Sequence, residues 1–348
     1  MDMPIKSYAL PELNDLMADL GQPAFRAKQI AQWLYVHRVH SYDEMTNLPA
    51  SLRSMLSERF PLFVPTVVER AVSHDGTKKY LIEYHDGVRV ETVSIPSRNG
   101  DRLTVCFSTQ AGCPMACTFC ATGKEGFVRN LAPGEIVDQV LIAQEDAEHR
   151  VSNVVGMGQG EPFLNYDNSL AALRILNGPK GLAIGARHMS VSTCGLIAGI
   201  DRFAREPEQF TLAISLHAAL QSVRDALMPN VARDDLPSLK SALQSYVAKT
   251  NRRVTLEHIM IRDMNDTQED LDALCSFCSD LLCHVNLIPM NAVDDSPLQP
   301  SSSSTVQHWL STIQNRGTEA TLRESRGSDI AGACGQLKNS FNSRNEQN

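Results

Sequence analysis

The spacing of hydrophobic residues changes once along the chain. In the first 66 residues, apolar side chains recur every three or four positions, as at Ile30, Trp33 and Leu34, which predicts amphipathic helices. Beyond residue 100, short apolar runs alternate with helical stretches. The strand-like runs are Leu103–Ser108, Asn153–Met157, His188–Thr193, Phe210–His217, Arg253–Ile261 and His284–Pro289, and the helical stretches include Pro133–Glu145, Tyr166–Leu176, Leu236–Ala248, Glu269–Leu282 and Ser304–Arg316.

Repeated strand–helix units predict an α/β fold with a parallel sheet and helices outside it. Six units favour an open, partial (β/α)6 barrel over a closed eight-stranded one, with Glu319–Glu324 as an added edge strand. Ahead of this core, Lys79–Tyr84 and Val88–Ile95 flank an Asp-Gly turn and predict a β-hairpin. We therefore expect a helical N-terminal domain (1–66), a connecting hairpin (67–98), an α/β core (99–335) and a C-terminal tail (336–348) that is polar and frayed at its end.

The composition is that of an ordinary globular protein. Of the 348 residues, 43% are hydrophobic and 21% are charged, which is typical of a folded chain. The first residues carry acids and a proline where a signal peptide needs an apolar run. No segment reaches about 18 uninterrupted apolar residues, so we expect no membrane span. Nine cysteines, an odd number, fit a reducing compartment, and we expect a cytoplasmic monomer.

The net charge of −8 argues against an RNA-binding field over the whole surface, so any RNA-binding surface must be a local patch. One such patch lies between Leu20 and Tyr42, a segment without acids that contains Arg26, Lys28 and Arg38. It is either a solvated helix face, since basic faces are common, or an RNA-docking surface, which needs Lys and Arg to neutralise phosphates.

Three cysteines, Cys113, Cys117 and Cys120, lie in one short loop after the first core strand. Thiolates at this spacing can hold three irons of a [4Fe–4S] cluster and leave the fourth iron open. An open iron can bind a small molecule and pass it an electron. The alternatives are tetrahedral zinc, for which Cys106 is the nearest fourth ligand, and unligated structural thiols. A disulfide between two of these cysteines would leave the third thiol unpaired.

Strand parity places small polar groups on one face of the predicted sheet. Cys106, Ser192, Ser215, His217 and Glu257 fall on the face opposite the apolar residues that outer helices would cover. A structural barrel core is filled by bulky branched residues. A lumen lined by small polar groups therefore predicts a ligand site.

With these residues assembled, the chain resembles the RlmN/Cfr family of radical S-adenosylmethionine (SAM) RNA methyltransferases, its RlmN branch most closely, over nearly its whole length. Gln159 and Cys194 stand where many members have Met and Ser, and neither is a proposed catalytic group. The motifs that carry the resemblance are Gln110-Ala-Gly-Cys-Pro-Met-Ala-Cys-Thr-Phe-Cys120, Gly160-Glu-Pro162, Ser192-Thr-Cys-Gly195, Ser215-Leu-His217, Asn286-Leu-Ile-Pro-Met-Asn291 and Arg326-Gly-Ser-Asp-Ile330 leading to Cys334.

The resemblance implies a [4Fe–4S] cluster on Cys113, Cys117 and Cys120, with SAM on the open iron. In the glycine-rich loop after the second strand, the Glu161 carboxylate can pair with the ammonium group of SAM. The SAM-binding residues that the resemblance implies are Gly160, Glu161, Ser192, Ser215, Leu216, His217 and Asn291.

The resemblance also implies a reaction with two SAM molecules, because the hydrogen on carbon 2 of adenine is not acidic and direct displacement fails. One SAM methylates Cys334, and the second gives a 5′-deoxyadenosyl radical that takes hydrogen from this methyl group. The resulting radical adds to the adenine, Glu91 accepts a proton, and Cys106 attacks the Cys334 sulfur, forming a disulfide as the base is released. The implied partners are adenosine 2503 of 23S rRNA, adenosine 37 of some tRNAs, and an electron donor such as flavodoxin or ferredoxin.

The residue pattern is compatible with the roles of Glu91, Cys106 and Cys334 that the resemblance implies, and also with purely structural roles for all three. Glu91 shares a strand face with Val93 and Ile95, so partial burial would raise its pKa toward that of a useful base, whereas most glutamates are exposed. Cys106 on the lumen face suits a resolving thiolate or a small buried apolar residue. Cys334 lies among small residues that leave room for a moving side chain or mark a helix end.

Rival functions remain open at this level. A Cfr-type enzyme that methylates carbon 8 shares the fold and the mechanistic cysteines, and a zinc-stabilised RNA-binding protein would use the same loop without catalysis. A radical SAM enzyme for small molecules is disfavoured by the basic N-terminal helix. We expect Cys275, Cys278 and Cys283 to be packing residues rather than ligands of a second cluster.

Overall fold

The computed structural model describes residues 3–179, 181–231, 233–291 and 296–338. The polar end of the tail, which we expect to be frayed, lies outside these residues. In the described residues, no helix has both the length and the apolar character needed to cross a bilayer.

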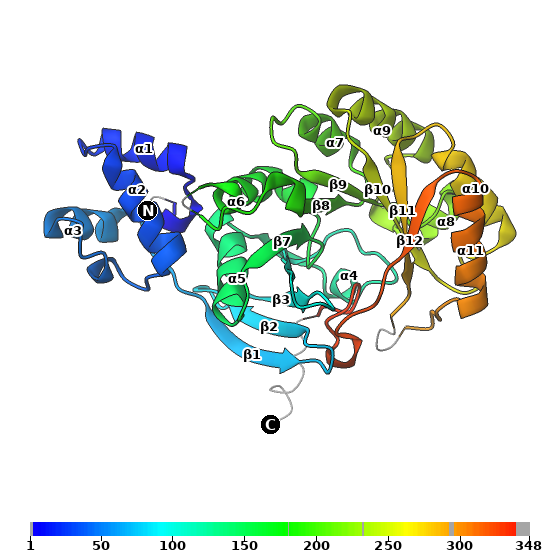
Figure 1. The fold of residues 1–348 in the computed structure, drawn as a ribbon, viewed down its shortest axis with the longest axis horizontal. Helices are drawn as coiled ribbons and strands as arrows, with labels where there is room; N and C mark the ends of the chain where they lie inside the picture. The colour runs from blue at the N-terminus through cyan, green and yellow to red at the C-terminus, as the bar shows by residue number, and fades with distance from the viewer. Residues whose placement is uncertain (1–2, 180, 232, 292–295, 339–348) are drawn as a thin grey trace.

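A ten-stranded mixed sheet forms the body of the molecule (Figure 1). From β4 to β12 all neighbouring strands are parallel, which confirms the predicted open α/β sheet and its added edge strand. In spatial order the strands are β1 (Thr66–Val72), β2 (Lys78–Glu83), β3 (Arg89–Pro96), β4 (Leu103–Cys106), β7 (Val151–Gly156), β8 (Met189–Thr193), β9 (Thr211–Ser215), β10 (Val254–Met260), β11 (Cys283–Pro289) and β12 (Glu319–Leu322).

Helices lie along the outside of the parallel strands (Figure 1). Their starts follow the local chemistry: Asp235 and Thr267 each accept a backbone N–H as N-caps, of α9 and α10, and Pro133 opens α5 with the fixed φ that suits a first turn. The helices of the core are α4 (Ala121–Glu125), α5 (Pro133–Glu145), α6 (Tyr166–Asn177), α7 (Ile197–Phe203), α8 (Gln221–Leu227), α9 (Leu236–Thr250), α10 (Gln268–Cys278) and α11 (Ser303–Asn315).

The connecting segment contains one strand more than the sequence predicts, and it belongs to the main sheet. The predicted strands are β2 and β3, but β1 precedes them and pairs antiparallel with β2. Six of the seven residues of β1 are exposed, so no alternation of apolar and polar positions marks it. Because β3 pairs antiparallel with β4, Val93 lies opposite Cys106. The hairpin therefore brings the strand of Glu91 beside the strand of Cys106.

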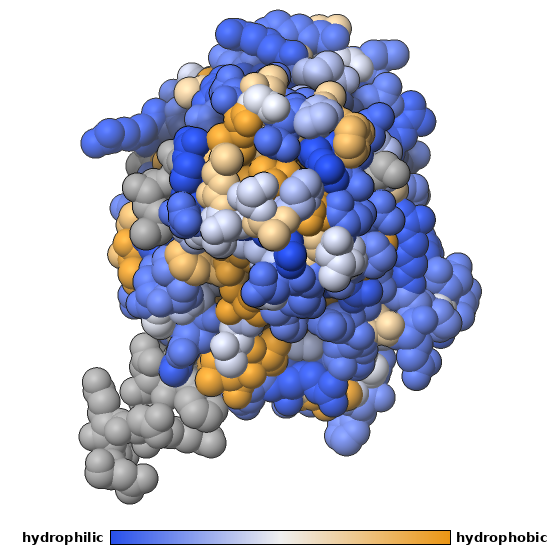
Figure 2. Space-filling view, turned by 90° about the vertical axis from the view of Figure 1, so that its left-hand side faces the viewer, coloured by the Kyte–Doolittle hydropathy of each residue, from blue (hydrophilic) through white to orange (hydrophobic). Residues whose placement is uncertain are grey.

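The N-terminal part is helical, as expected, with different helix bounds. Its elements are α1 (Leu10–Asp19), α2 (Phe25–Gln32), a π-helical turn (Trp33–His37) and α3 (Ala50–Arg59). The helix expected within 20–42 ends at Arg38, whose φ of 54° reverses the chain. Ile30 and Leu34 are buried, whereas Lys28 is exposed. Figure 2 shows this side of the molecule as mostly hydrophilic with separate hydrophobic patches.

A buried ion pair fastens the N-terminal part to the core. The Lys6 ammonium donates to the Asp138 carboxylate of α5 at 2.7 Å, and both side chains are less than 10% exposed. Next to it, the Gly134 N–H donates to the Ser7 hydroxyl at 3.1 Å, and the Tyr35 hydroxyl donates to the Lys6 carbonyl at 3.1 Å. The first turn of α5 is thus the anchor for the N-terminal helices.

Replacing Asp138 with Asn should destabilise the protein strongly, because the Lys6 cation stays buried without its counter-charge. We expect the free energy of unfolding in urea to fall by about 3 kcal/mol. The matched control is Arg316→Gln, which breaks the exposed pair with Asp272 and should cost no more than about 1 kcal/mol. Equal losses in the two variants would contradict the anchor.

Candidate active site

The three-cysteine loop is closed by backbone hydrogen bonds between β5 (Gln110–Gly112) and β6 (Phe127–Asn130), a small antiparallel sheet. The Cys113 N–H donates to the Gly126 carbonyl at 2.8 Å, and the Cys120 N–H to the Cys117 carbonyl at 3.1 Å. Ala116 has a φ of 54°, a left-handed conformation that turns the chain between the first two cysteines. The loop is therefore tightly fixed by its own backbone.

All three cysteines line one cavity of about 140 Å³. In the described residues, no three His, Cys, Asp or Glu side chains are arranged to hold a single metal ion. Three thiols on one cavity wall can hold three irons of a [4Fe–4S] cluster and leave the fourth iron facing the cavity. The cavity is also lined by Gly160, Glu161, Ser192, Cys194, Ser215, His217, Glu257, Arg323 and Cys334.

Burial keeps the uncomplexed thiols of Cys113 and Cys120 protonated. It raises the pKa of Cys113 to about 12 and also raises the pKa of Cys120. Because metal–sulfur bonds need thiolates, loading a cluster here must release protons.

Five of the predicted SAM-binding residues meet in this cavity. Glu161 is buried, and its carboxylate accepts the N–H groups of Phe163 at 2.9 Å and Cys194 at 2.6 Å. Burial nevertheless raises its pKa. Gly160 has a φ of +100°, and a Cβ there would lie 2.6 Å from the Gln110 side chain, so the turn requires glycine.

His217 faces the same cavity as a neutral ring. Its Nδ1 accepts the Ile259 N–H at 3.2 Å, and its ring packs edge-on against Phe119 with centroids 4.7 Å apart. Burial lowers its pKa well below the ordinary value. The proton of the neutral ring is therefore on Nε2.

Two predicted binding residues lie elsewhere. The Leu216 side chain is fully buried in the hydrophobic core and lines neither this cavity nor the next one. Asn291 lines the neighbouring cavity instead, where its amide donates to the Cys334 carbonyl at 3.2 Å. In this structure Asn291 holds the C-terminal segment.

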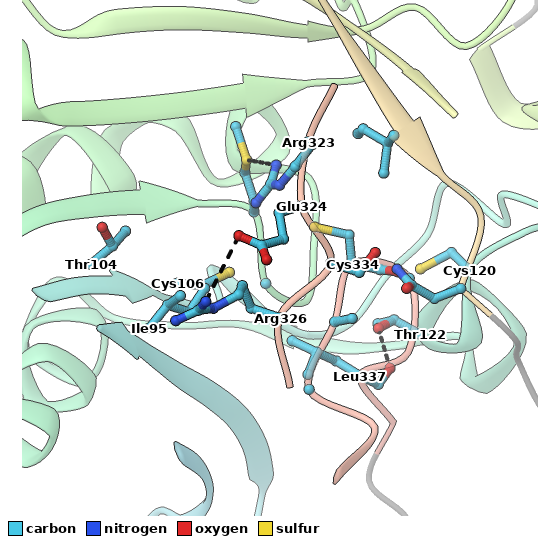
Figure 3. A pocket seen from close by; sticks show the side chains of 18 residues that line it. Ile95, Thr104, Cys106, Cys120, Thr122, Arg323, Glu324, Arg326, Cys334 and Leu337 are labelled. Carbon is cyan, nitrogen blue, oxygen red and sulfur yellow. Dashed lines mark hydrogen bonds and ion pairs between the residues drawn. The ribbon is translucent and has the colours of Figure 1, made fainter. Parts of the chain in front are cut away.

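Cys106 and Cys334 line this second cavity, of about 250 Å³ (Figure 3). Cys106 comes from β4, and Cys334 from the C-terminal segment, which crosses the carboxyl ends of the strands. This segment is fixed to the cysteine loop by the Ala121 N–H, which donates to the Gly335 carbonyl at 2.8 Å, and by the Thr122 hydroxyl, which donates to the Leu337 carbonyl at 2.6 Å. The two cavities share Cys120 and Cys334, among other residues.

All nine cysteines are free thiols. The disulfide that the family resemblance implies between Cys106 and Cys334 is therefore not a feature of this state. Burial raises the pKa of Cys106 to about 12, while the positive charge of Arg323 opposes that rise. A resolving thiolate at Cys106 needs this cationic neighbour.

Glu91 is buried, as its strand face predicts, but it lines neither cavity. Its carboxylate pairs with the Lys79 ammonium at 2.9 Å and accepts the Lys338 N–H at 2.8 Å. Burial raises its pKa to about 7, with Lys79 opposing the shift. Gln159, one of the departures from the family pattern, accepts the Glu91 N–H at 2.9 Å and so helps to fix this strand.

The sequence gives no signal for Arg323, the residue that joins the two cavities. It follows β12, lines both cavities, and lies 3.8 Å from the Glu257 carboxylate. The thiols of Cys334 and Cys106 and the carboxylate of Glu257 all raise its pKa. A single arginine after an edge strand has no local pattern that could mark it.

The turn between β1 and β2 holds the loop that leads to Cys334. The Ser73 hydroxyl donates to the Asp329 carboxylate at 2.6 Å. Asp75 accepts the Gly327 N–H at 3.0 Å and pairs with Arg326 at 3.4 Å. The Arg326–Ile330 motif therefore positions the loop. Its Arg326 lines the cavity of Cys106 and Cys334 but not the cavity of the three-cysteine loop.

Comparison with known proteins matches this geometry. Residues 5–62 match the ribosomal RNA large subunit methyltransferase N-terminal domain, and residues 107–278 match the radical SAM superfamily. A crystal structure of a radical SAM methyltransferase from Sphaerobacter thermophilus is 42% identical, with a TM-score of 0.91 over 97% of this chain and 99% of that one. The fold and the cysteine loop together thus define this chain as a radical SAM protein.

The full-length relatives narrow the class. The chain is 42% identical to a probable dual-specificity RNA methyltransferase RlmN from Clostridium novyi, over 97% of this chain and 98% of the relative. It is 45% identical to one so named from Synechococcus elongatus, over 96% and 93%. The chain belongs to the RlmN family of radical SAM RNA methyltransferases.

The raised pKa of Glu91 predicts a pH dependence of stability. The folded state binds this proton more tightly than the unfolded state, whose pKa is near 4.5. The contribution is therefore complete below pH 4.5 and is lost as the pH rises through about 7. Relative to Glu91→Gln, the wild type should lose about 2 kcal/mol of unfolding free energy between pH 5 and pH 8. Parallel pH profiles in urea unfolding would contradict the shift.

Proposed function

We propose that the protein methylates carbon 2 of adenosine in RNA, at adenosine 2503 of 23S rRNA and adenosine 37 of some tRNAs, through a methyl group carried on Cys334. The observation that supports this most is that Cys334 lines both cavities, the one bounded by the three cysteines and the one that contains Cys106. Relatives at 42% identity are named as dual-specificity RNA methyltransferases.

Cys113, Cys117 and Cys120 would hold the [4Fe–4S] cluster. When bound, the cluster supplies the electron that cleaves SAM, and thereby the radical that takes a hydrogen atom from the S-methyl group. Glu161 would hold the ammonium group of SAM, since each of its oxygens accepts one backbone N–H and keeps a lone pair for another donor. The electron is expected from a flavodoxin or a ferredoxin.

Cys334 would carry the methyl group from the first SAM to the RNA. Its sulfur attacks the SAM methyl carbon, and the sulfonium leaves as neutral S-adenosylhomocysteine. The thiolate is the nucleophilic form of cysteine, and the positive charge of Arg323 lies beside this sulfur in both cavities. The flanking Gly332 and Gly335 leave room for the modified side chain in the cavity they line.

Glu91 and Cys106 would complete the transfer. With a pKa of about 7, Glu91 is partly ionised at neutral pH and can accept the proton that leaves carbon 2. The Lys338 N–H now occupies one of its oxygens, so the segment at 337–338 must move first. The adduct must also give up its unpaired electron to a redox partner. Cys106 then attacks the Cys334 sulfur, the carbon–sulfur bond breaks, the freed methylene carbon takes up a proton to become the methyl group, and a disulfide remains that a reductant must open.

The RNA itself would dock on the N-terminal side of the molecule. Lys28, His37 and His40 are exposed there, on the part that matches the rRNA methyltransferase N-terminal domain. Basic side chains on this surface can neutralise phosphates without a net positive protein.

Cys334→Ala should keep the cluster and lose methylation. Anaerobic reconstitution should still give about four irons per chain, because Cys334 is not a cluster ligand, while methyl transfer to RNA from labelled SAM falls to background. Cys275→Ala, a buried cysteine in α10, is the matched control and should stay active. Methylation that persists in Cys334→Ala would refute the carrier role.

Cys106→Ala should trap the covalent protein–RNA adduct, because no thiol can then attack the Cys334 sulfur. We expect a slow-migrating, ribonuclease-sensitive band on a denaturing gel after incubation with SAM, reductant and RNA. The double variant Cys106→Ala/Cys334→Ala is the control and should give no such band. An adduct in the double variant would place the linkage on another residue.

A further inference from the structure

A buried arginine lies directly behind the cysteine cavity without a carboxylate partner. Arg224, in α8, is 1% exposed. Its guanidinium donates to three backbone carbonyls, those of Cys194 at 2.6 Å, Leu216 at 2.6 Å and Ser215 at 3.1 Å. Its Nε has no acceptor, and in the described part of the chain the guanidinium forms no ion pair.

An unpaired buried cation is costly, because carbonyl dipoles replace only part of the hydration that a charge loses. Burial accordingly lowers the pKa of Arg224, and the groups that oppose this most are the thiols of Cys194 and Cys117. Asp225 and Asp234 contribute less. Both sulfurs line the cysteine cavity, and Cys117 would carry a negative charge as a thiolate when it holds a cluster.

The local structure is shaped to bring this charge close to the cysteines. Gly195 has a φ of +96°, and a Cβ there would lie 3.1 Å from the Arg224 guanidinium, so glycine leaves the space that the cation fills. The Cys194 thiol is hydrogen-bonded to Cys117. Arg224 thus contacts Cys194, which in turn contacts Cys117, one of the proposed cluster ligands.

We propose that Arg224 is the internal counter-charge of the iron–sulfur cluster and raises its reduction potential. The inference rests on the cluster that Cys113, Cys117 and Cys120 are proposed to hold. Reduction adds one electron and one unit of negative charge to that cluster. A fixed cation nearby stabilises the reduced state more than the oxidised one, because potential depends on net charge and hydrogen bonding around the sulfurs. Arg224 is a positioning residue, since it lines neither of the two cavities.

The carboxylate of Glu161 also lies next to Cys194, and its charge is opposite to that of Arg224. It lies on the cavity side of Cys194, accepting the Cys194 N–H, where the ammonium group of SAM would neutralise it. Arg224 lies on the opposite side, at the Cys194 carbonyl. The two charges therefore serve two different ligands.

The test is the midpoint potential of the cluster in Arg224→Gln, measured in an anaerobic redox titration followed by electron paramagnetic resonance. Glutamine can still donate to a carbonyl but carries no charge. At a fixed donor potential, its ratio of reduced to oxidised cluster should fall at least tenfold, which is a shift of 59 mV for one electron. Arg224→Lys, which keeps the charge, should stay within threefold of the wild type.

The matched control is Arg252→Gln. Arg252 also donates to backbone carbonyls, those of Phe210 and Glu208, but at the opposite end of β9, so its loss should leave the potential unchanged. A glutamine variant at position 224 with full cluster content and an unchanged potential would overturn the proposal. If the glutamine variant does not hold a cluster, the proposal is tested on Arg224→Lys instead. A lysine variant with the wild-type potential supports the counter-charge. A folded lysine variant that holds no cluster refutes it. A wild type that binds no cluster would instead refute the proposed function.

Discussion

The return of the C-terminal segment across the carboxyl ends of the strands is the constraint on which the active site depends. Cys106 and Cys334 are more than two hundred positions apart in the sequence, yet they line one cavity. Two hydrogen bonds to the cysteine loop, from Ala121 and from Thr122, fix the segment at one end. The β1–β2 turn holds it through Asp75 at the other. Without these contacts the cysteine loop and Cys334 would be separate features.

Three charged side chains, Arg323, Glu91 and Arg224, lie at different places around the two cavities. Arg323 lines both cavities, and Cys334 and Cys106 raise its pKa. Glu91 accepts the Lys338 N–H of the segment, and burial raises its pKa to about 7. Arg224 lies behind the cysteine cavity, where it donates to three backbone carbonyls and to the Met228 sulfur. Each charged group thus has different neighbours within one small site.

The sequence predicts most of the fold and brings together most of the candidate site. Strand and helix periods predict the parallel strands, and the spacing of Cys113, Cys117 and Cys120 predicts a cluster loop, because both signals are local. The strand β1 was missed since its residues are exposed on both faces. Arg323 and Arg224 were missed for another reason: their role depends on which carbonyls and thiols the fold brings near them, and no spacing along the chain records that.

The most direct test of the account is the nucleoside content of 23S rRNA from bacteria that lack this protein, measured by liquid chromatography and mass spectrometry. The account predicts that 2-methyladenosine disappears from the rRNA and returns when the wild-type protein, but not Cys334→Ala, is supplied. Unchanged 2-methyladenosine, or loss of 8-methyladenosine in its place, would contradict the assignment of carbon 2 chemistry to this chain.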